Sequence, residues 1–210
     1  MQITFPKTTS RILTTLTWLA TAALTAILGV VLHELGHFLM ALLMGFDGLS
    51  FHYEWVSYAN EDLITGRIMA GDLAGAVGFY PLWQIVLVSA AGPLTTLVLQ
   101  AGGLLALLRR PGPFFASLAL TANLRAIPLL ISTLLQPGFT GADEDLIGHV
   151  LGLPPALLAL PGALLFVGGS WVILRRLPKG GRLIPAVMMI LGAFAGLIVY
   201  LGFLGPSLLP

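Results

Sequence analysis

The stretch from Val30 to Leu43, VVLHELGHFLMALL, places two histidines and a glutamate inside an apolar run. His33 and His37 are four residues apart, so on a helix their imidazoles project from one face and can bind one metal ion. Glu34 follows the first histidine and can act as general base toward a metal-activated water. This H-E-x-x-H spacing predicts a Zn²⁺ site of the kind that hydrolyses peptide bonds. The alternative is a polar cluster that only joins neighbouring helices.

A catalytic zinc site of this kind needs a third protein ligand, and carboxylates serve in that role. The best candidate is Asp143, which precedes an apolar stretch and is expected to begin a helix. Asp145 and Glu144 are rivals, and all three acids could instead be helix caps or solvated loop charges. His52 and His149 are isolated histidines, which are more often hydrogen-bonded structural residues than ligands.

The composition indicates where these groups lie. Hydrophobic residues make up 57% of the 210-residue chain and charged residues only 9%, whereas a soluble domain carries about 25% charged residues. We therefore expect an all-α polytopic membrane protein whose partner is the lipid bilayer. The net charge of +1 implies no nucleic-acid partner, and the absence of cysteine excludes disulfides and thiolate metal sites.

Five apolar tracts are long enough to cross a membrane, which takes about 20 residues each. They cover residues 12–46, 82–108, 114–135, 155–174 and 183–204. The first tract is too long for one perpendicular crossing, so it must tilt, break or protrude. We treat the chain as one integral-membrane domain, residues 1–210, with a core at about 25–150 and accessory helices at about 155–205.

Basic residues occupy alternate connections between the tracts. Lys7 and Arg11 precede the first, Arg109 and Arg110 separate the second and third, and four basic residues lie at 175–182. The positive-inside rule then places the N-terminus in the cytoplasm and the C-terminus outside. No cleavable signal peptide is evident, and the small size fits a prokaryotic plasma membrane.

The segment from Leu49 to Ala70 has a different pattern. Its aromatic residues alternate with polar ones over a short stretch, and a polar turn at 59–62 separates it from a second apolar stretch at 64–69. Period two favours strands, so we expect a short β-hairpin or re-entrant loop after the first membrane helix. An interfacial loop with a belt of aromatic residues is the alternative.

Three of these features together resemble the site-two protease family of intramembrane zinc metalloproteases. They are HELGH in a membrane helix, the Gly-Pro element in AAGPLTT at 90–96, and Asp143 after a third span. The resemblance covers about residues 25–150. It implies that His33, His37 and Asp143 bind zinc, that a re-entrant hairpin follows the first core helix, and that Asn123 contacts substrate.

The chain also departs from the family pattern. Thr95 and Thr96 stand where an asparagine usually follows the Gly-Pro element, and Asp143 is followed by Glu144 instead of glycine. The resemblance is therefore to a divergent, minimal branch.

The sequence thus predicts a zinc metalloprotease, with Glu34 as catalytic base, that hydrolyses peptide bonds in or beside the membrane-spanning segments of substrate proteins. The rival functions are a non-catalytic zinc-binding membrane protein, a small transporter, and another class of membrane zinc protease. Arg125 is an isolated basic residue in the third tract, and it is expected to pair with an acid or to reach the interface. The substrate's identity and the oligomeric state are not encoded in any motif.

Overall fold

The structure is a computed structural model that describes residues 7–122, 124–135, 142–177 and 181–209. The described elements are α1 (Lys7–Leu43), β1 (Ser50–Phe51), β2 (Val56–Ser57), α2 (Glu61–Met69), α3 (Leu73–Val77), α4 (Leu82–Arg109), α5 (Pro113–Thr121), α6 (Ala126–Leu135), α7 (Asp143–Leu151), α8 (Pro155–Arg176), α9 (Leu183–Val199), the π-helix η1 (Tyr200–Leu204) and α10 (Gly205–Leu208).

The described residues include five helical segments long and apolar enough to cross a membrane, which confirms an all-α polytopic membrane protein. These segments are Arg11–Leu43, Leu82–Arg109, Pro113–Leu135, Pro155–Arg176 and Leu183–Leu208. Large apolar side chains remain exposed along the outside of α1, α4, α8 and α9. In a bilayer such side chains face lipid, so their exposure follows from the composition.

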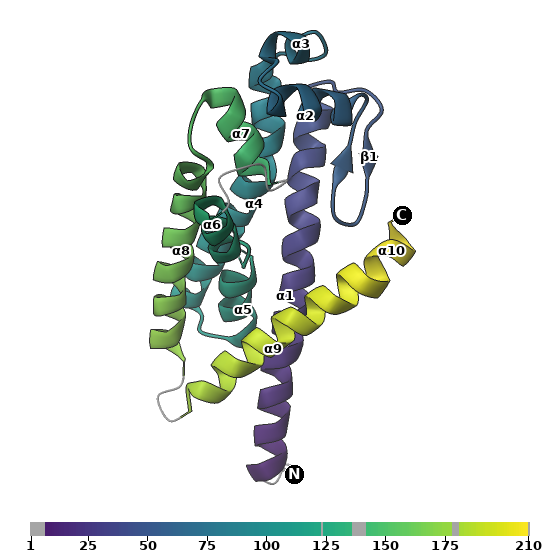
Figure 1. Ribbon diagram of the computed structural model, residues 1–210. Helices are drawn as coiled ribbons and strands as arrows, with labels where there is room; N and C mark the ends of the chain where they lie inside the picture. Colours follow the sequence, from purple (N-terminus) through teal and green to yellow (C-terminus); the bar gives the residue numbers. More distant parts are fainter. Residues whose placement is uncertain (1–6, 123, 136–141, 178–180, 210) are drawn as a thin grey trace.

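Helix α1 runs through the centre of the molecule, and α9 crosses it obliquely (Figure 1). It contains 37 residues without a break, which corresponds to about 55 Å at 1.5 Å per residue. The hydrocarbon core is only about 30 Å thick. The first tract is therefore neither broken nor confined to the core: α1 tilts in the membrane, extends beyond it, or both.

The third tract differs from the single helix that the sequence predicts. Helix α5 ends at Thr121 and α6 begins at Ala126, so the chain turns inside the apolar tract. Pro128 explains the interruption, because it has no N–H for the carbonyl of Leu124 and its ring would clash there in a continuous helix. Arg125 lies in this turn.

A β-hairpin does follow α1, but both of its strands lie at the first predicted strand, and the predicted pairing with the stretch at 64–69 is wrong. Strands β1 and β2 pair antiparallel, with Ser50 opposite Ser57 and Phe51 opposite Val56. The second predicted strand is instead helix α2. Ile64 and Ile68 are fully buried on one face of α2, and this i, i+4 spacing is helical. Glu61 and Asp62 in its first turn favour the helix by interacting with its dipole.

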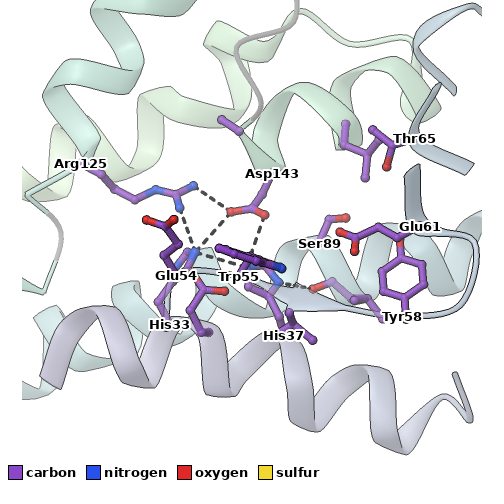
Figure 2. Close-up of a pocket in the computed structure, with 15 residues that line it drawn as sticks. His33, His37, Glu54, Trp55, Tyr58, Glu61, Thr65, Ser89, Arg125 and Asp143 are labelled. Atoms are coloured by element: carbon purple, nitrogen blue, oxygen red, sulfur yellow. Dashed lines mark hydrogen bonds and ion pairs between the residues drawn. The ribbon is translucent and has the colours of Figure 1, made fainter. Parts of the chain in front are cut away.

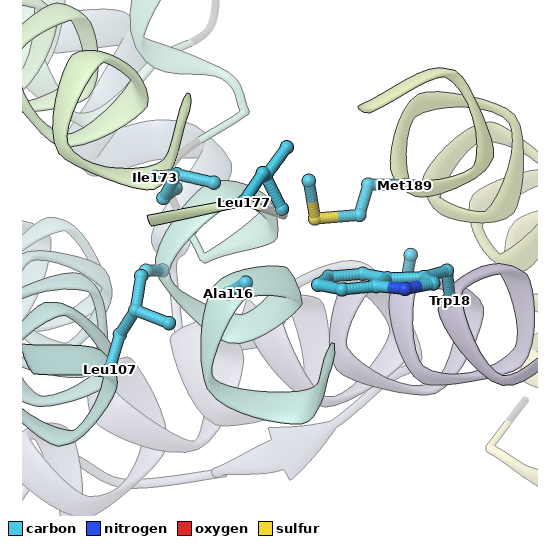
Figure 3. Close-up of a cluster of buried hydrophobic side chains, with 8 residues drawn as sticks. Trp18, Leu107, Ala116, Ile173, Leu177 and Met189 are labelled. Atoms are coloured by element: carbon cyan, nitrogen blue, oxygen red, sulfur yellow. The ribbon is translucent and has the colours of Figure 1, made fainter. Parts of the chain in front are cut away.

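Two clusters of buried apolar side chains hold the bundle together. One joins α1, α4, α5, α8 and α9 and contains Trp18, Ala22, Leu107, Ala116, Ala119, Ile173, Leu177 and Met189 (Figure 3). The other fixes α2 and α3 over the ends of α1 and α4, and contains Ala41, Phe46, Ile64, Ile68, Ala76, Ile85 and Val88. The predicted site lies between these clusters, because His33 and His37 are on the part of α1 that separates them.

The basic connections lie at one end of the bundle. Helices α4 and α8, whose last turns carry Arg109, Arg175 and Arg176, both end toward the side of the bundle on which α1 begins, and α1 extends beyond them (Figure 1). The α2–α3 segment, the hairpin and α7 lie toward the opposite end.

Candidate metal centre

His33 and His37 occupy successive turns of α1 and point toward the same place. Their Nε2 atoms are 3.2 Å apart, and both residues are buried, with exposed fractions of 6% and 7%. The edge-to-face arrangement of the rings places the two nitrogens together at one side of the imidazole pair. The helical spacing predicted from the sequence is therefore realised in an unbroken helix.

Asp143 is the acid that reaches the histidines. As the first residue of α7, it places Oδ2 3.4 Å from His33 Nε2 and Oδ1 3.3 Å from His37 Nε2 (Figure 2). One ligand atom from each residue lies within 4.8 Å of the others. Within the described part of the chain, these three residues form a group that can hold a metal ion.

A backbone carbonyl orients the second imidazole. His37 Nδ1 lies 2.7 Å from the carbonyl oxygen of Val88 on α4. Since a carbonyl can only accept a hydrogen bond, Nδ1 carries the proton and the lone pair of neutral His37 is on Nε2. That lone pair points toward Asp143, as metal ligation requires.

Gly92 provides the space that the imidazoles occupy. It lies on α4 opposite the histidines, and a Cβ at this position would overlap His37 Nε2 and approach His33 Nε2 to 2.7 Å. Any larger residue would therefore fill the place where the two ligand nitrogens converge. In the sequence, Gly92 was notable only as part of the Gly-Pro element.

Arg125 pairs with two acids, Asp143 and Glu144, and does not extend to the membrane interface alone as the sequence also allowed. Its guanidinium donates to Asp143 Oδ2 at 3.0 Å and to Glu144 Oε2 at 2.6 Å, and it also donates to His33 Nε2 at 2.8 Å. Burial alone would raise the pKa of Asp143, but the contacts of its carboxylate with His33 and His37 and the charge of Arg125 hold that pKa well below its usual range. The carboxylate is thus kept ionised, as a ligand must be.

A cavity of about 310 Å³ opens beside the histidines and Asp143. Glu34, which is 9% exposed, lines this cavity. The hairpin contributes Glu54 and Trp55, and α2 contributes Glu61 and Thr65. The hairpin and α2 therefore form one wall of the cavity (Figure 2). Burial, reinforced by the charge of Asp62, raises the pKa of Glu61 to about 7.

The other candidate ligands have different partners. Glu144 pairs with Arg125, and neither it nor Asp145 belongs to the metal-binding group. His52 stacks on Trp55 with ring centroids 4.6 Å apart, and His149 Nδ1 donates to the carbonyl oxygen of Asp145. The preference for Asp143 over these residues therefore matches the geometry. Asn123, the predicted substrate contact, lies outside the described residues.

Comparisons of the chain with protein-family models, with curated proteins and with solved structures find no match. The functional assignment therefore rests on the residues of the site.

Proposed function

We propose that this protein is an intramembrane zinc metalloprotease that hydrolyses peptide bonds in or next to membrane-spanning segments of substrate proteins. The convergence of His33, His37 and Asp143 beside Glu34 and a polar cavity supports the proposal most directly. Ionisable groups inside an apolar bundle are costly, and they generally serve a function.

Zinc is the metal that this donor set suits best. Zinc accepts imidazole and carboxylate ligands at about 2.0–2.2 Å, and tetrahedral geometry then sets ligand-to-ligand separations of about 3.3–3.5 Å. The two imidazole Nε2 atoms, 3.2 Å apart, are close to this spacing, and each has one oxygen of the Asp143 carboxylate within 3.4 Å. The space opposite Gly92 and the Val88 carbonyl that orients His37 also favour a built metal site.

Bound zinc would polarise the scissile carbonyl and make water a stronger nucleophile. Glu34 accepts a proton from the attacking water and delivers it to the departing amide nitrogen. Arg125 keeps the Asp143 carboxylate directed at the imidazoles, and Val88 keeps the His37 lone pair directed inward. Water reaches Glu34 through the polar cavity.

The hairpin offers a means of holding an unwound substrate. A helical substrate hides its amides in internal hydrogen bonds, whereas an extended one exposes them and can pair with a strand edge. Val56 of β2 and the hairpin residues Glu54 and Trp55 line the cavity, so an added strand would pass beside Glu34.

The decisive experiment co-reconstitutes the protein with a panel of single-span membrane proteins and compares the wild type with Glu34→Gln. Loss of the general base is expected to reduce cleavage by about 10²–10⁴-fold, while zinc content measured by mass spectrometry remains at one per chain. Asp143→Ala is expected to lose zinc, and Asp145→Ala is the matched control that retains it. Unchanged cleavage by Glu34→Gln would sink the enzymatic proposal. Stoichiometric zinc without cleavage by the wild type would favour a non-catalytic metal site.

We further propose a prokaryotic plasma membrane as the location, with the N-terminus in the cytoplasm. The basic connections at the end of the bundle where α1 begins support this orientation. Because the chain has no cysteine, Gly112→Cys and Asn60→Cys can be labelled from one side of intact cells. We expect an impermeant maleimide to label only position 60 from outside, and the reverse pattern would overturn the orientation.

A further inference from the structure

A second cavity, of about 180 Å³, adjoins the metal-binding group on its other side. Its walls come from four elements: Val30 on α1, Thr96 on α4, Thr121 at the end of α5, and Leu197 on α9. His33, Glu34 and Arg125 line both this cavity and the polar one. The two cavities therefore meet at the proposed base and the first ligand.

The two cavities differ in chemistry and in their place along α1. The α1 residues that line only the second cavity lie one to two turns before His33, whereas the polar cavity extends beyond His33 to His37. Apart from the shared residues and two threonines, the second cavity has apolar walls. The polar cavity is walled by the hairpin, α2 and α7, which lie toward one end of the bundle (Figure 1).

A peptide whose carbonyl reaches the imidazole pair must place its neighbouring side chains in these two spaces. An extended chain advances about 3.3 Å per residue and alternates its side chains between opposite faces. The residue next to the scissile bond on one side is thus within reach of the apolar cavity. A cavity of about 150 Å³ accepts a benzene-sized apolar group, so an aliphatic side chain fits here.

The second cavity also has unused hydrogen-bonding atoms in its wall residues. Thr121 Oγ1 and His33 Nδ1 are buried and have no hydrogen-bond partner among the described residues. A buried polar atom without a hydrogen-bond partner is destabilising. The backbone of an unwound peptide carries both donors and acceptors, and it could satisfy both atoms.

We propose that this apolar cavity is a specificity subsite, which receives an aliphatic side chain directly beside the scissile bond. The inference rests on the proposed protease function and specifies its substrate class. The substrate is a membrane-spanning segment cleaved near the end at which it leaves the apolar bundle for the polar cavity. Val30 and Leu197 are the specificity-determining residues, because they line this cavity and do not belong to the metal-binding group.

The test digests a library of membrane-spanning peptides in detergent and identifies the cleavage sites by mass spectrometry. The wild type is expected to require an aliphatic residue at one fixed position beside the cut. Leu197→Ala enlarges the cavity and should shift the preference at that position toward aromatic residues by at least about tenfold. Val30→Phe narrows it and should shift the preference toward alanine or glycine.

Ile198→Ala is the matched control, because Ile198 is the next residue along α9 and its side chain is 64% exposed. It should leave the preference unchanged, and zinc content verifies that each variant retains its site.

Cleavage with the same preference in Leu197→Ala and Val30→Phe would overturn the subsite while leaving the protease function intact. The subsite would also be overturned if Leu197→Ala and Val30→Phe changed only how thermal stability depends on the detergent or lipid. Such a result would indicate that an acyl chain occupies the cavity. No cleavage by the wild type above the Glu34→Gln background would refute the protease function, and the subsite with it.

Discussion

Gly92 on α4 and Gly192 on α9 both face α1, but they leave room for different groups. A Cβ at Gly92 would overlap the His37 imidazole, whereas a Cβ at Gly192 would overlap the backbone carbonyl of Leu19. Gly196, one turn beyond Gly192, meets the carbonyl of Ala23 in the same way. Gly92 leaves room for the imidazoles of the metal-binding group. The G-x-x-x-G pair Gly192 and Gly196 allows α9 and α1 to pack closely in the membrane.

The difference shows that the two halves of α1 are held by different forces. Its first half packs by close backbone contact and by the Trp18 cluster, which bury no charge. Its second half joins the apolar cluster around Ala41, and it also carries imidazoles that contact the Val88 carbonyl on α4 and the Asp143 carboxylate on α7. Such polar groups are costly in a bilayer unless paired. A substitution at either glycine should therefore damage one property and spare the other.

Gly92→Ala is expected to have the largest effect, on metal binding. The added methyl occupies the space of the ligand nitrogens, so zinc affinity should fall by more than about 100-fold, the upper end of the losses produced by supporting residues. Competition with a chelating dye measures the affinity. Gly102→Ala is the control on the same helix, because a Cβ there meets nothing within 4 Å. Equal zinc affinity in both variants would contradict the role of Gly92.

Arg125→Gln tests whether charge pairing holds the second half of α1 and α7 together. If Arg125 positions Asp143, zinc affinity should fall by about 10–100-fold, as for other residues that orient a ligand. Arg125→Lys should recover only part of this loss, since an ammonium cannot present the guanidinium's planar fork to the two acids. Tighter zinc binding in Arg125→Gln would instead show that the guanidinium merely competes with the metal for His33 Nε2.

Gly192→Ala is expected to lower stability and to leave zinc affinity unchanged. Forcing α9 away from α1 should cost about 1–3 kcal/mol, as for other overpacked contacts. Thermal unfolding in detergent micelles measures the loss. Gly202→Ala is the control, because it lies in η1 with open space around it. A Gly192→Ala protein as stable as that control would remove the proposed contrast between the two glycines.

Glu61→Gln is expected to have the smallest effect, and that effect depends on pH. The pKa of Glu61 is raised from its ordinary 4.5 to about 7 by burial, so ionisation opposes folding. The wild type should lose stability relative to Glu61→Gln as the pH rises from about 4.5 to 7, and the difference should stay constant above that range. Above pH 7 we expect the difference in the free energy of unfolding between the two proteins to be about 1 kcal/mol, after allowance for solvent screening. A difference that is the same at pH 4 and pH 8 would contradict the assigned ionisation.

Much of the fold follows from apolar tract length, which predicted the second span within one residue of α4. The third tract was misread as a single helix because it was placed by apolar length alone, without regard to Pro128. The second strand of the hairpin was misread because Ile64 and Ile68 were interpreted in an alternating pattern, although their spacing is helical. The G-x-x-x-G pair at Gly192 was present in the sequence and was not used.

The sequence by itself determined the membrane class, the number of helical segments long and apolar enough to cross a membrane among the described residues, and the placement of His33, Glu34 and His37 on one helix. Each of these depends on local composition or on a spacing of a few residues. The sequence favoured Asp143 but left Glu144 and Asp145 as rivals, and only the tertiary structure decided among the three. It also decided which partners Arg125 takes, and that Gly92 and the Val88 carbonyl shape the site. These outcomes depend on how helices distant in the chain pack. A run of three acids, or a backbone carbonyl present at every residue, carries no such information.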